Sequence, residues 1–316
     1  MNPGGRAATT PLRRAGYRLL GPVFDYILHL RPAEWPIMAA HTVLGYFLAV
    51  GVRGALAGER LGQAGFGLLI WVVLLNGGTL ALNSAFDRDE GDIGYLKAPP
   101  PAPRHLALVS LLLLAAGQLL ALRLPRGYAL AYAACFVMSL AYSVPPIRLK
   151  AVAGLDWIIN MVGFGTLTPY AGYAATGRQM EPSHVLVLLA FLPLFASLYP
   201  LTQLYQFDED RRRGDRTLAL ILGMRRSLQL AVVAAVVAFT MFCWAGTRAG
   251  WGTPGAGPAR WVGLALAAAV WGWVLLPWLR NHEGMTPAAH QRGMYAALGA
   301  WAVTDLVVIL AWGLYT

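Results

Sequence analysis

Two short acidic clusters are the residues of this chain whose types and spacing could do chemistry. In the first, NSAFDRDEGD, Asn83 and Asp87 are four residues apart and would share one face of a helix. The second, DEDRRRGD, begins at Asp208 and follows another apolar segment. Carboxylate and amide oxygens suit Mg²⁺, which completes its coordination shell with water and phosphate oxygens. Two facing clusters could therefore hold Mg²⁺ on either side of a diphosphate and neutralise a leaving group.

The metal-binding interpretation of the acidic clusters has a plain alternative. The acids could be solvated loop residues that pair with basic neighbours such as Arg88 and Arg211. Two clusters at helix ends on one predicted side of the membrane favour metal binding over this alternative. The candidate metal ligands are Asn83, Asp87, Asp89, Asp92, Asp208 and Asp210, and Asp215 follows them after a glycine.

A basic loop, AYSVPPIRLKA at residues 141–151, is expected on the same side as the acidic clusters. The Pro145-Pro146 pair should stiffen its backbone in an extended form. Arg148 and Lys150 follow, and their cationic groups could bind phosphate oxygens. The alternative is an ordinary loop whose basic residues mark the cytoplasmic side. Arg31, just before the first long apolar run, is a further candidate whose alternative is an interfacial anchor.

Long apolar runs must position these groups. Hydrophobic residues make up 57% of the chain and charged residues only 13%, which is typical of integral membrane proteins. A spanning helix needs roughly 20 mostly apolar residues. We therefore predict an all-α membrane protein with nine transmembrane helices, near residues 34–52, 64–86, 104–124, 127–143, 153–176, 184–206, 226–246, 260–279 and 292–315.

The distribution of basic residues predicts the orientation of these helices. With the N-terminus in the cytoplasm, 18 of the 25 lysine and arginine residues fall on inner segments, in agreement with the positive-inside rule. The net charge of +10 then reports topology and lipid headgroups, and no nucleic-acid partner is expected. We expect a multi-pass protein of the cell inner membrane, with both acidic clusters on the cytoplasmic side.

The first 30 residues are expected to form a cytoplasmic tail. They are basic and lack a clean apolar core followed by a small-residue cleavage site, so they do not resemble a signal peptide. An amphipathic interfacial helix is predicted around residues 16–30, and the membrane domain over residues 31–316. Cys135 and Cys243 are too few for a disulfide framework.

Six other polar residues are candidates for a substrate cavity or for helix packing, among them Gln206 beside Tyr205. Asp156 and Asn160 lie one turn apart, where they could orient a substrate or form structural pairs. Tyr142 and Tyr205 end two apolar runs, a position that aromatic belts also explain. Asp305 lies deep in the last run, and for it we favour a hydrogen bond between helices.

The three motifs together resemble the UbiA superfamily of intramembrane prenyltransferases. That family carries an N-x-x-x-D-x-x-x-D motif after its second helix and a D-x-x-x-D motif after its sixth. Many members also have a Tyr-Ser and Pro-Pro loop that ends in Arg/Lys-Leu-Lys. Here NSAFDRDEGD, YSVPPIRLK and DEDRRRGDRTLA fall in the same order and at the same helix ends. The resemblance covers nearly the whole chain.

The resemblance implies a nine-helix bundle around a central cavity that opens to lipid. A polyprenyl diphosphate would be held at the cytoplasmic rim by Mg²⁺ and ionised, and a small lipophilic acceptor, expected to be aromatic, would capture the allylic carbocation. Asn83, Asp87 and Asp210 are then the candidate catalytic residues, and the candidate diphosphate ligands are Arg31, Lys97, Arg148 and Lys150. The same ionisation without an acceptor would make a terpene cyclase. A cation transporter is the alternative from another class.

The chain departs from the family pattern in both acidic motifs. The third position of the first motif is Gly91, so that Asp89 or Asp92 must substitute for the missing carboxylate. In the second motif the first aspartate position falls on Gln206, and Asp208 is expected to supply the charge. The loop that contains Lys97 also departs from the family's common continuation.

Overall fold

The computed structural model describes residues 10–87, 92–93, 95–253 and 258–314, and within these ranges the chain is helical and contains no strand. The N-terminal part comprises α1 (Pro11–Leu20), α2 (Val23–His29), the short η1 (Pro32–Glu34), α3 (Trp35–Leu56), α4 (Leu61–Leu69), η2 (Ile70–Gly77), α5 (Gly78–Asp87), α6 (Leu106–Ala121) and α7 (Arg126–Ser143). The remainder comprises η3 (Leu149–Ala151), α8 (Leu155–Asn160), η4 (Met161–Leu167), α9 (Thr168–Ala175), α10 (Pro182–Gln203), α11 (Phe207–Arg213), α12 (Leu218–Arg248), α13 (Ala259–Asn281), η5 (His282–Gly284) and α14 (Pro287–Gly313).

The predicted all-helical membrane fold is confirmed. Each predicted apolar segment coincides with one helix or with a continuous helical run. Six stretches of the described chain are long and apolar enough to cross a membrane: Val23–Leu56, Leu61–Asp87, Pro182–Gln203, Leu218–Arg248, Ala259–Gly284 and Pro287–Gly313. Leu106–Ala121 is apolar but shorter. The total of nine spans and the cytoplasmic N-terminus stay predictions.

The N-terminal segment forms two helices instead of the single helix predicted around residues 16–30. The break lies at Gly21, whose φ is 54°, followed by Pro22. Pro22 has no backbone N–H and therefore cannot continue the hydrogen-bond ladder of α1. Leu12 and Leu19 on α1 are each 83% exposed, so this short helix carries apolar side chains on its surface.

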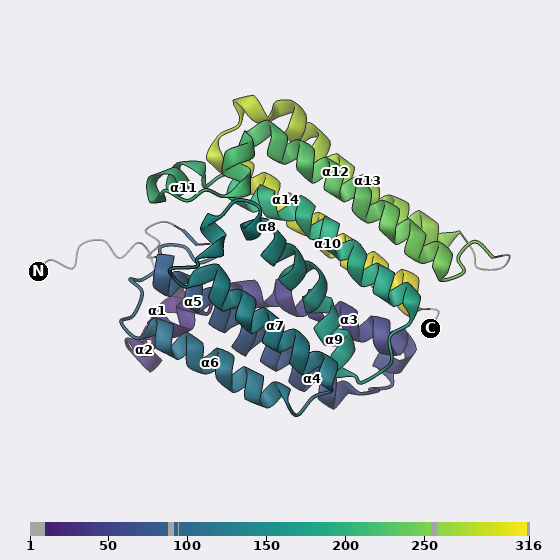
Figure 1. Cartoon of the computed structure of the whole chain (residues 1–316), viewed down its shortest axis with the longest axis horizontal. Coiled ribbons are helices and arrows are strands. Elements are labelled where there is room, and N and C mark those ends of the chain that lie inside the picture. Colours follow the sequence, from purple (N-terminus) through teal and green to yellow (C-terminus); the bar gives the residue numbers. More distant parts are fainter. Residues whose placement is uncertain (1–9, 88–91, 94, 254–257, 315–316) are drawn as a thin grey trace, which may run out of the picture.

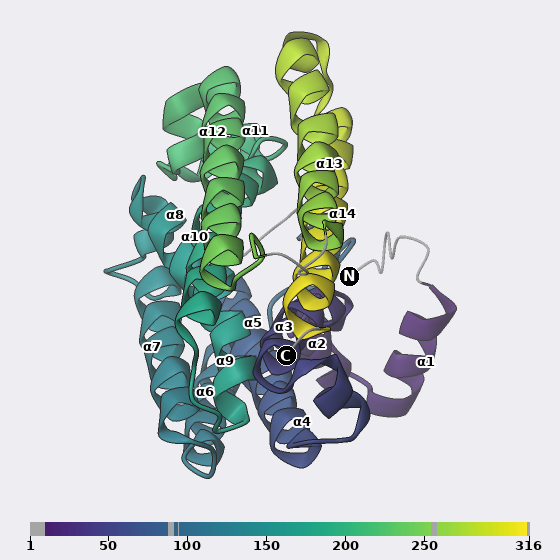
Figure 2. The ribbon, with the colours of Figure 1, turned by 90° about the vertical axis from the view of Figure 1, so that its right-hand side faces the viewer.

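Two groups of buried side chains form the core on either side of the bundle. One group lies mainly on α10, α12, α13 and α14, and the other mainly on η2, α6 and α7. Figure 1 shows α12 and α13 on one flank and α6 and α7 on the other, and Figure 2 shows the same separation after rotation. Helices α3 and α9 contribute to both groups. They therefore join the two halves of the molecule.

Two π-helical segments interrupt the helical runs inside the bundle. η2 connects α4 to α5, and η4 connects α8 to α9. A π-helical turn widens the helix and changes the direction of the side chains that follow, and such turns often lie at functional sites. Both segments contribute side chains to the cavity described next, including Trp71 and Asn76 from η2 and Phe164 from η4.

Candidate active site

A cavity of about 460 Å³ opens between the two halves of the bundle. Its volume is in the usual range for a small-molecule site. One part of its lining is polar and comes from the end of α5, the loops after α5 and α7, and the segment between α10 and α12, whereas another part is apolar and aromatic. The polar lining includes Asn83, Asp87, Asp92, Lys150, Asp210 and Asp215. The apolar lining includes Met38, Trp71, Leu75, Phe164, Phe195 and Leu198.

The first acidic motif faces this cavity from the last two turns of α5. Asn83 and Asp87 both line it, as their four-residue spacing requires. The ammonium group of Lys150 donates to Asn83 Oδ1 at 3.1 Å and forms an ion pair with Asp87. A second cation, the guanidinium of Arg148, lies 3.5 Å from Asp87 Oδ1. Asp87 is therefore a buried carboxylate with two cationic neighbours.

The second acidic motif contributes Asp210 and Asp215 to the cavity. Helix α11 ends at Gly214, whose φ of 74° turns the chain back so that the backbone N–H of Asp215 donates to the Asp210 carbonyl at 3.0 Å. Both aspartates are only 7% exposed and both line the cavity. A side chain at Gly214 would be strained in this left-handed conformation.

The structure does not bring Asp208 to the cavity. Its carboxylate is 88% exposed and pairs with Arg211 at 3.1 Å, because Asp208 lies two residues before Asp210 on α11 and therefore on the opposite face of the helix. The solvated-acid alternative therefore describes Asp208. Asp215 is not among the ligands predicted from the sequence, although the glycine before it, which allows the chain to reverse, is a signal for it.

The basic loop after α7 turns and is not extended as expected. The peptide bond between Pro145 and Pro146 is cis, and the N–H of Arg148 donates to the Val144 carbonyl at 3.0 Å. The loop then runs beside the segment before α12, where the N–H of Arg216 donates to the Ala151 carbonyl at 3.3 Å.

This path of the basic loop places the Arg148 guanidinium between the two acidic motifs. Arg148 Nη1 donates to Asp215 Oδ1 at 2.6 Å, while its Nη2 lies 3.5 Å from Asp87 Oδ1. One side chain therefore touches a carboxylate from each motif.

Two of the predicted phosphate ligands have a backbone conformation that is unusual for residues other than glycine. Arg31 and Arg148 have φ values of 51° and 36°, in the left-handed region. Such a conformation costs on the order of 1–3 kcal/mol per residue and is often found at functional sites. Arg31 is 7% exposed, lines the cavity and donates from Nη2 to Ser84 Oγ at 3.1 Å. It is not positioned as an anchor at a lipid interface.

Four predicted polar residues line the cavity: Tyr142, Asn160, Tyr205 and Gln206. Three further polar residues of α10 line it but could not be picked out from the sequence, because they lie within a long apolar run: Tyr199, Thr202 and Gln203. Tyr142 and Tyr199 share a hydroxyl hydrogen bond of 2.9 Å, and Gln203 Nε2 donates to the Tyr199 hydroxyl at 3.1 Å. These groups form a polar wall beside the acidic motifs.

Asp156 lies outside the cavity lining and is fully buried. Its Oδ1 accepts from the N–H of Gly154 at 2.8 Å, and its Oδ2 accepts from the N–H of Leu218 at 3.1 Å. Gln203 Nε2 lies at 3.4 Å from the same Oδ2. Asp156 therefore ties the beginning of α8 to the beginning of α12, which is the structural role that the sequence left open.

The loop after α5 contributes unequally to the cavity. Asp92 lines it and accepts from the N–H of Ala98 at 2.8 Å, whereas Lys97 is exposed and lies outside the lining. Asp89 falls outside the described residues.

Tyr95 contacts Tyr295 of α14, with ring centroids 5.3 Å apart. Burial, and then the neighbouring Tyr295 and Glu34, raise the pKa of Tyr95, so its hydroxyl stays protonated at neutral pH.

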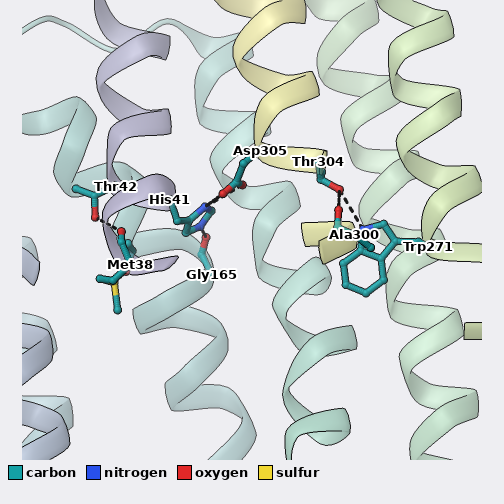
Figure 3. A network of polar contacts seen from close by, with 9 residues as sticks. Met38, His41, Thr42, Gly165, Trp271, Ala300, Thr304 and Asp305 are labelled. Atoms are coloured by element: carbon teal, nitrogen blue, oxygen red, sulfur yellow. Dashed lines mark hydrogen bonds and ion pairs between the residues drawn. The ribbon is translucent and has the colours of Figure 1, made fainter. Parts of the chain in front are cut away.

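Asp305 forms the predicted hydrogen bond between helices. Its carboxylate lies 3.1 Å from Nδ1 of His41 on α3 (Figure 3), and neither residue belongs to the cavity lining. The partner could not be identified from the sequence, because His41 is 264 residues away.

The donor set fits a hard cation that also binds substrate. In the described part of the chain, no three His, Cys, Asp or Glu side chains lie close enough together to hold a metal by themselves. Mg²⁺ usually takes one or two carboxylates and fills its shell with water and phosphate oxygens. Asn83 with Asp87, and Asp210 with Asp215, provide such oxygens from two sides.

The chain is similar to known proteins over most of its length. A sequence model described as the UbiA prenyltransferase family matches residues 38–298. Digeranylgeranylglyceryl phosphate synthase of Natronomonas pharaonis is 31% identical over 214 residues, which are 66% of this chain and 73% of that protein. Lycopene elongase/hydratase of Haloferax volcanii is 28% identical over 237 residues, 73% of this chain and 76% of the relative.

A solved structure has the same fold. The UbiA homologue of Archaeoglobus fulgidus bound to GPP and Mg²⁺ superposes with a TM-score of 0.65 at 18% identity, and the match covers 90% of this chain and 99% of the homologue.

Proposed function

Because the chain belongs to the UbiA prenyltransferase family and is a membrane prenyltransferase, we propose that it transfers a prenyl group from a polyprenyl diphosphate to a lipophilic acceptor in a Mg²⁺-dependent reaction. One observation carries the proposal. Two acidic motifs, distant in sequence, line the polar part of one cavity whose other lining is apolar and aromatic. A diphosphate with a long hydrocarbon tail has the same division into a charged and an apolar part.

The metal would be held by Asn83, Asp87, Asp210 and Asp215, with Asp92 close by in the cavity lining. The Archaeoglobus homologue bound to GPP and Mg²⁺ supports this choice of ion. When bound, Mg²⁺ neutralises charge on a phosphate leaving group. The first three of these ligands are the catalytic residues predicted from the sequence. Asp215 is proposed as a ligand in place of Asp208.

The cations of the site would bind the diphosphate directly. Arg148 and Lys150 now contact Asp87 and Asp215, where opposite charges compensate one another away from water. A bound diphosphate would pair with Arg148 and Lys150. Its metal would pair with Asp87 and Asp215. Arg31, buried at the same cavity, offers a third cation. Guanidinium groups bind phosphate oxygens through paired N–H donors.

The apolar wall would hold the prenyl chain and protect the cation formed from it. Trp71, Phe164 and Phe195 line this part of the cavity. Aromatic faces stabilise a nearby positive charge, and the exclusion of water prevents premature capture of a carbocation. The acceptor would bind beside the polar wall of Tyr142, Tyr199 and Gln203.

The acceptor class has three candidates. An aromatic ring was predicted from the sequence and stays a prediction. The names of the two relatives point instead to a glyceryl phosphate lipid and to lycopene. Supplying each of the three classes to the purified protein with Mg²⁺ and a prenyl diphosphate, and weighing the products by mass spectrometry, identifies the class.

The site itself is tested with Asp87→Ala and Asp210→Ala, using Asp208→Ala as the matched control on the solvent side of α11. We expect the two cavity variants to lose prenyl transfer by about 10²-fold or more, as when a group that stabilises developing charge is removed. The control variant should retain the activity of the parent protein. Full turnover by both cavity variants would refute the mechanism.

Two further results would replace the proposal. A hydrocarbon or terpene alcohol formed from the diphosphate alone would identify a cyclase. Metal-dependent ion flux in liposomes, without consumption of diphosphate, would identify a transporter.

A further inference from the structure

A buried histidine joins three helical segments at a distance from the acidic motifs. His41 of α3 is fully buried. Its Nδ1 lies 3.1 and 3.2 Å from the two carboxylate oxygens of Asp305 on α14, and its Nε2 lies 3.2 Å from the carbonyl oxygen of Gly165 in η4 (Figure 3). A single imidazole ring therefore connects α3, α14 and the π-helical segment η4.

The hydrogen-bond partners fix the protons of this pair. A carbonyl oxygen can only accept, so His41 Nε2 must carry a proton and donate it to Gly165. The contact between Nδ1 and Asp305 then needs one further proton, held by either partner. In both cases the pair has no net charge, which suits its position inside the bundle.

The third partner, Gly165, is next to a residue of the cavity wall. Phe164 lines the cavity, and its ring stacks on the His41 ring with centroids 5.6 Å apart and planes 11° apart. A Cβ at Gly165 would lie only 2.8 Å from the carbonyl oxygen of Phe191, so η4 packs directly against the backbone of α10. His41 thus fixes both the backbone of η4 and the face of the Phe164 ring.

The position of Phe164 bears on the depth of the cavity. Asn160, one helical turn earlier in the same run, lies beside the polar wall, where it donates to the Asp156 carbonyl. Phe164 lies one turn further from that wall and contacts Phe195, another lining residue, with ring centroids 4.7 Å apart. Thr168, one turn beyond Phe164, also lines the cavity, so the two rings form a part of the apolar wall that a longer prenyl chain would have to pass.

We propose that His41 and Asp305 are positioning residues that limit the length of the prenyl chain by holding Phe164 in the cavity wall. This inference rests on the proposed prenyl transfer. Without the hydrogen bonds to Asp305 and Gly165, η4 can shift and the Phe164 ring can leave its place. The cavity then accepts longer chains and discriminates less against them.

The test replaces the pair in two ways. His41→Phe/Asp305→Leu removes both hydrogen bonds, and since no charge is left unpaired we expect this double variant to fold. Asp305→Asn keeps a polar partner, because its amide can donate to Nδ1 of neutral His41. Phe164→Ala removes the ring itself.

Thr304→Val is the matched control, on the residue next to Asp305. The Thr304 hydroxyl accepts from Trp271 Nε1 at 3.0 Å and donates to the Ala300 carbonyl at 2.9 Å, so it joins α14 to α13 and not to η4 (Figure 3). This variant also removes a buried hydrogen bond from α14, but it leaves the contacts of His41 in place.

The measurement is the ratio of kcat/KM for a 20-carbon prenyl diphosphate to that for a 10-carbon one. We expect the double variant and Phe164→Ala to raise this ratio about tenfold, a factor typical of small changes in a hydrophobic pocket. Asp305→Asn and Thr304→Val should keep the ratio of the parent protein.

An unchanged ratio in the double variant or in Phe164→Ala would overturn the inference while leaving prenyl transfer intact. An equal change in Thr304→Val would also overturn it, because general loosening of α14 would then be the cause. Failure of the parent protein to consume any prenyl diphosphate would refute the proposed function first, and the inference with it.

Discussion

Arg148 and Asp215 form a salt bridge of 2.6 Å between the loop after α7 and the segment after α11. The contact is forked, since the second guanidinium nitrogen lies 3.4 Å from the other carboxylate oxygen. It joins the basic loop to the second acidic motif, and the same guanidinium reaches Asp87 of the first. The three motifs found in the sequence therefore meet at one side chain.

Replacing Asp215 tests whether it belongs to the reactive site. We expect Asp215→Asn to lower kcat/KM for the prenyl diphosphate by about 10²-fold, because a buried oxygen ligand loses its charge. Asp208→Asn, an identical change on the exposed side of α11, should leave kcat/KM within about twofold, since surface ion pairs contribute little. Steady-state kinetics on both purified variants provide the comparison. A large loss of kcat/KM in Asp208→Asn with none in Asp215→Asn would instead identify Asp208 as the ligand.

Replacing Arg148 by lysine tests the planar fork separately from the charge. Lysine keeps the positive charge but cannot make two parallel hydrogen bonds to a carboxylate or a phosphate. We expect Arg148→Lys to raise KM for the diphosphate about tenfold and to change kcat less. The exposed Arg211→Lys is the control. If both variants have the KM of the parent protein, the fork has no part in binding.

Asp156 should affect stability more than chemistry. Asp156→Ala would leave the buried N–H groups of Gly154 and Leu218 without an acceptor, at about 1–3 kcal/mol for each. The expected result is a clearly lower temperature of thermal inactivation in detergent, with turnover per folded molecule retained. Asp156→Asn keeps one acceptor oxygen, so its temperature of thermal inactivation should lie between those of Asp156→Ala and the parent protein. If Asp156→Ala were thermally stable but inactive, Asp156 would instead be a residue of the reactive site.

Removal of divalent metal should stop turnover. Because the described residues provide oxygen ligands from two sides and no complete site of their own, we expect the metal to be lost readily to a chelator. Activity should disappear in EDTA and return with added Mg²⁺. The measurement is diphosphate release with and without the chelator, and turnover that persists in EDTA would contradict the metal assignment.

Features that depend on local sequence could be predicted, and those that depend on chain reversal could not. The shared face of Asn83 and Asp87 follows from helical spacing alone. The choice between Asp208 and Asp215 depends on where α11 ends and on the left-handed turn at Gly214, and boundaries of this kind are the weakest part of a sequence-based prediction.

Long-range partners were beyond the reach of sequence reasoning for a similar reason. A polar bond for Asp305 was expected from the high free energy of a carboxylate inside a membrane. Its partner His41 lies at the other end of the chain, and only the packing of α14 against α3 brings them together. The π-helical segments have no sequence signature that periodicity could detect, since their apolar residues also fit an α-helix.

The ion pair between Lys150 and Asp87 has a consequence for how the protein is made. Both residues belong to the part of the chain that leaves the ribosome first, whereas Asp210 and Asp215 follow later. The carboxylate of Asp87 can thus be compensated by Lys150 before α11 and α12 are synthesised. The second acidic motif is then added to a half-site that already carries no unpaired charge at Asp87.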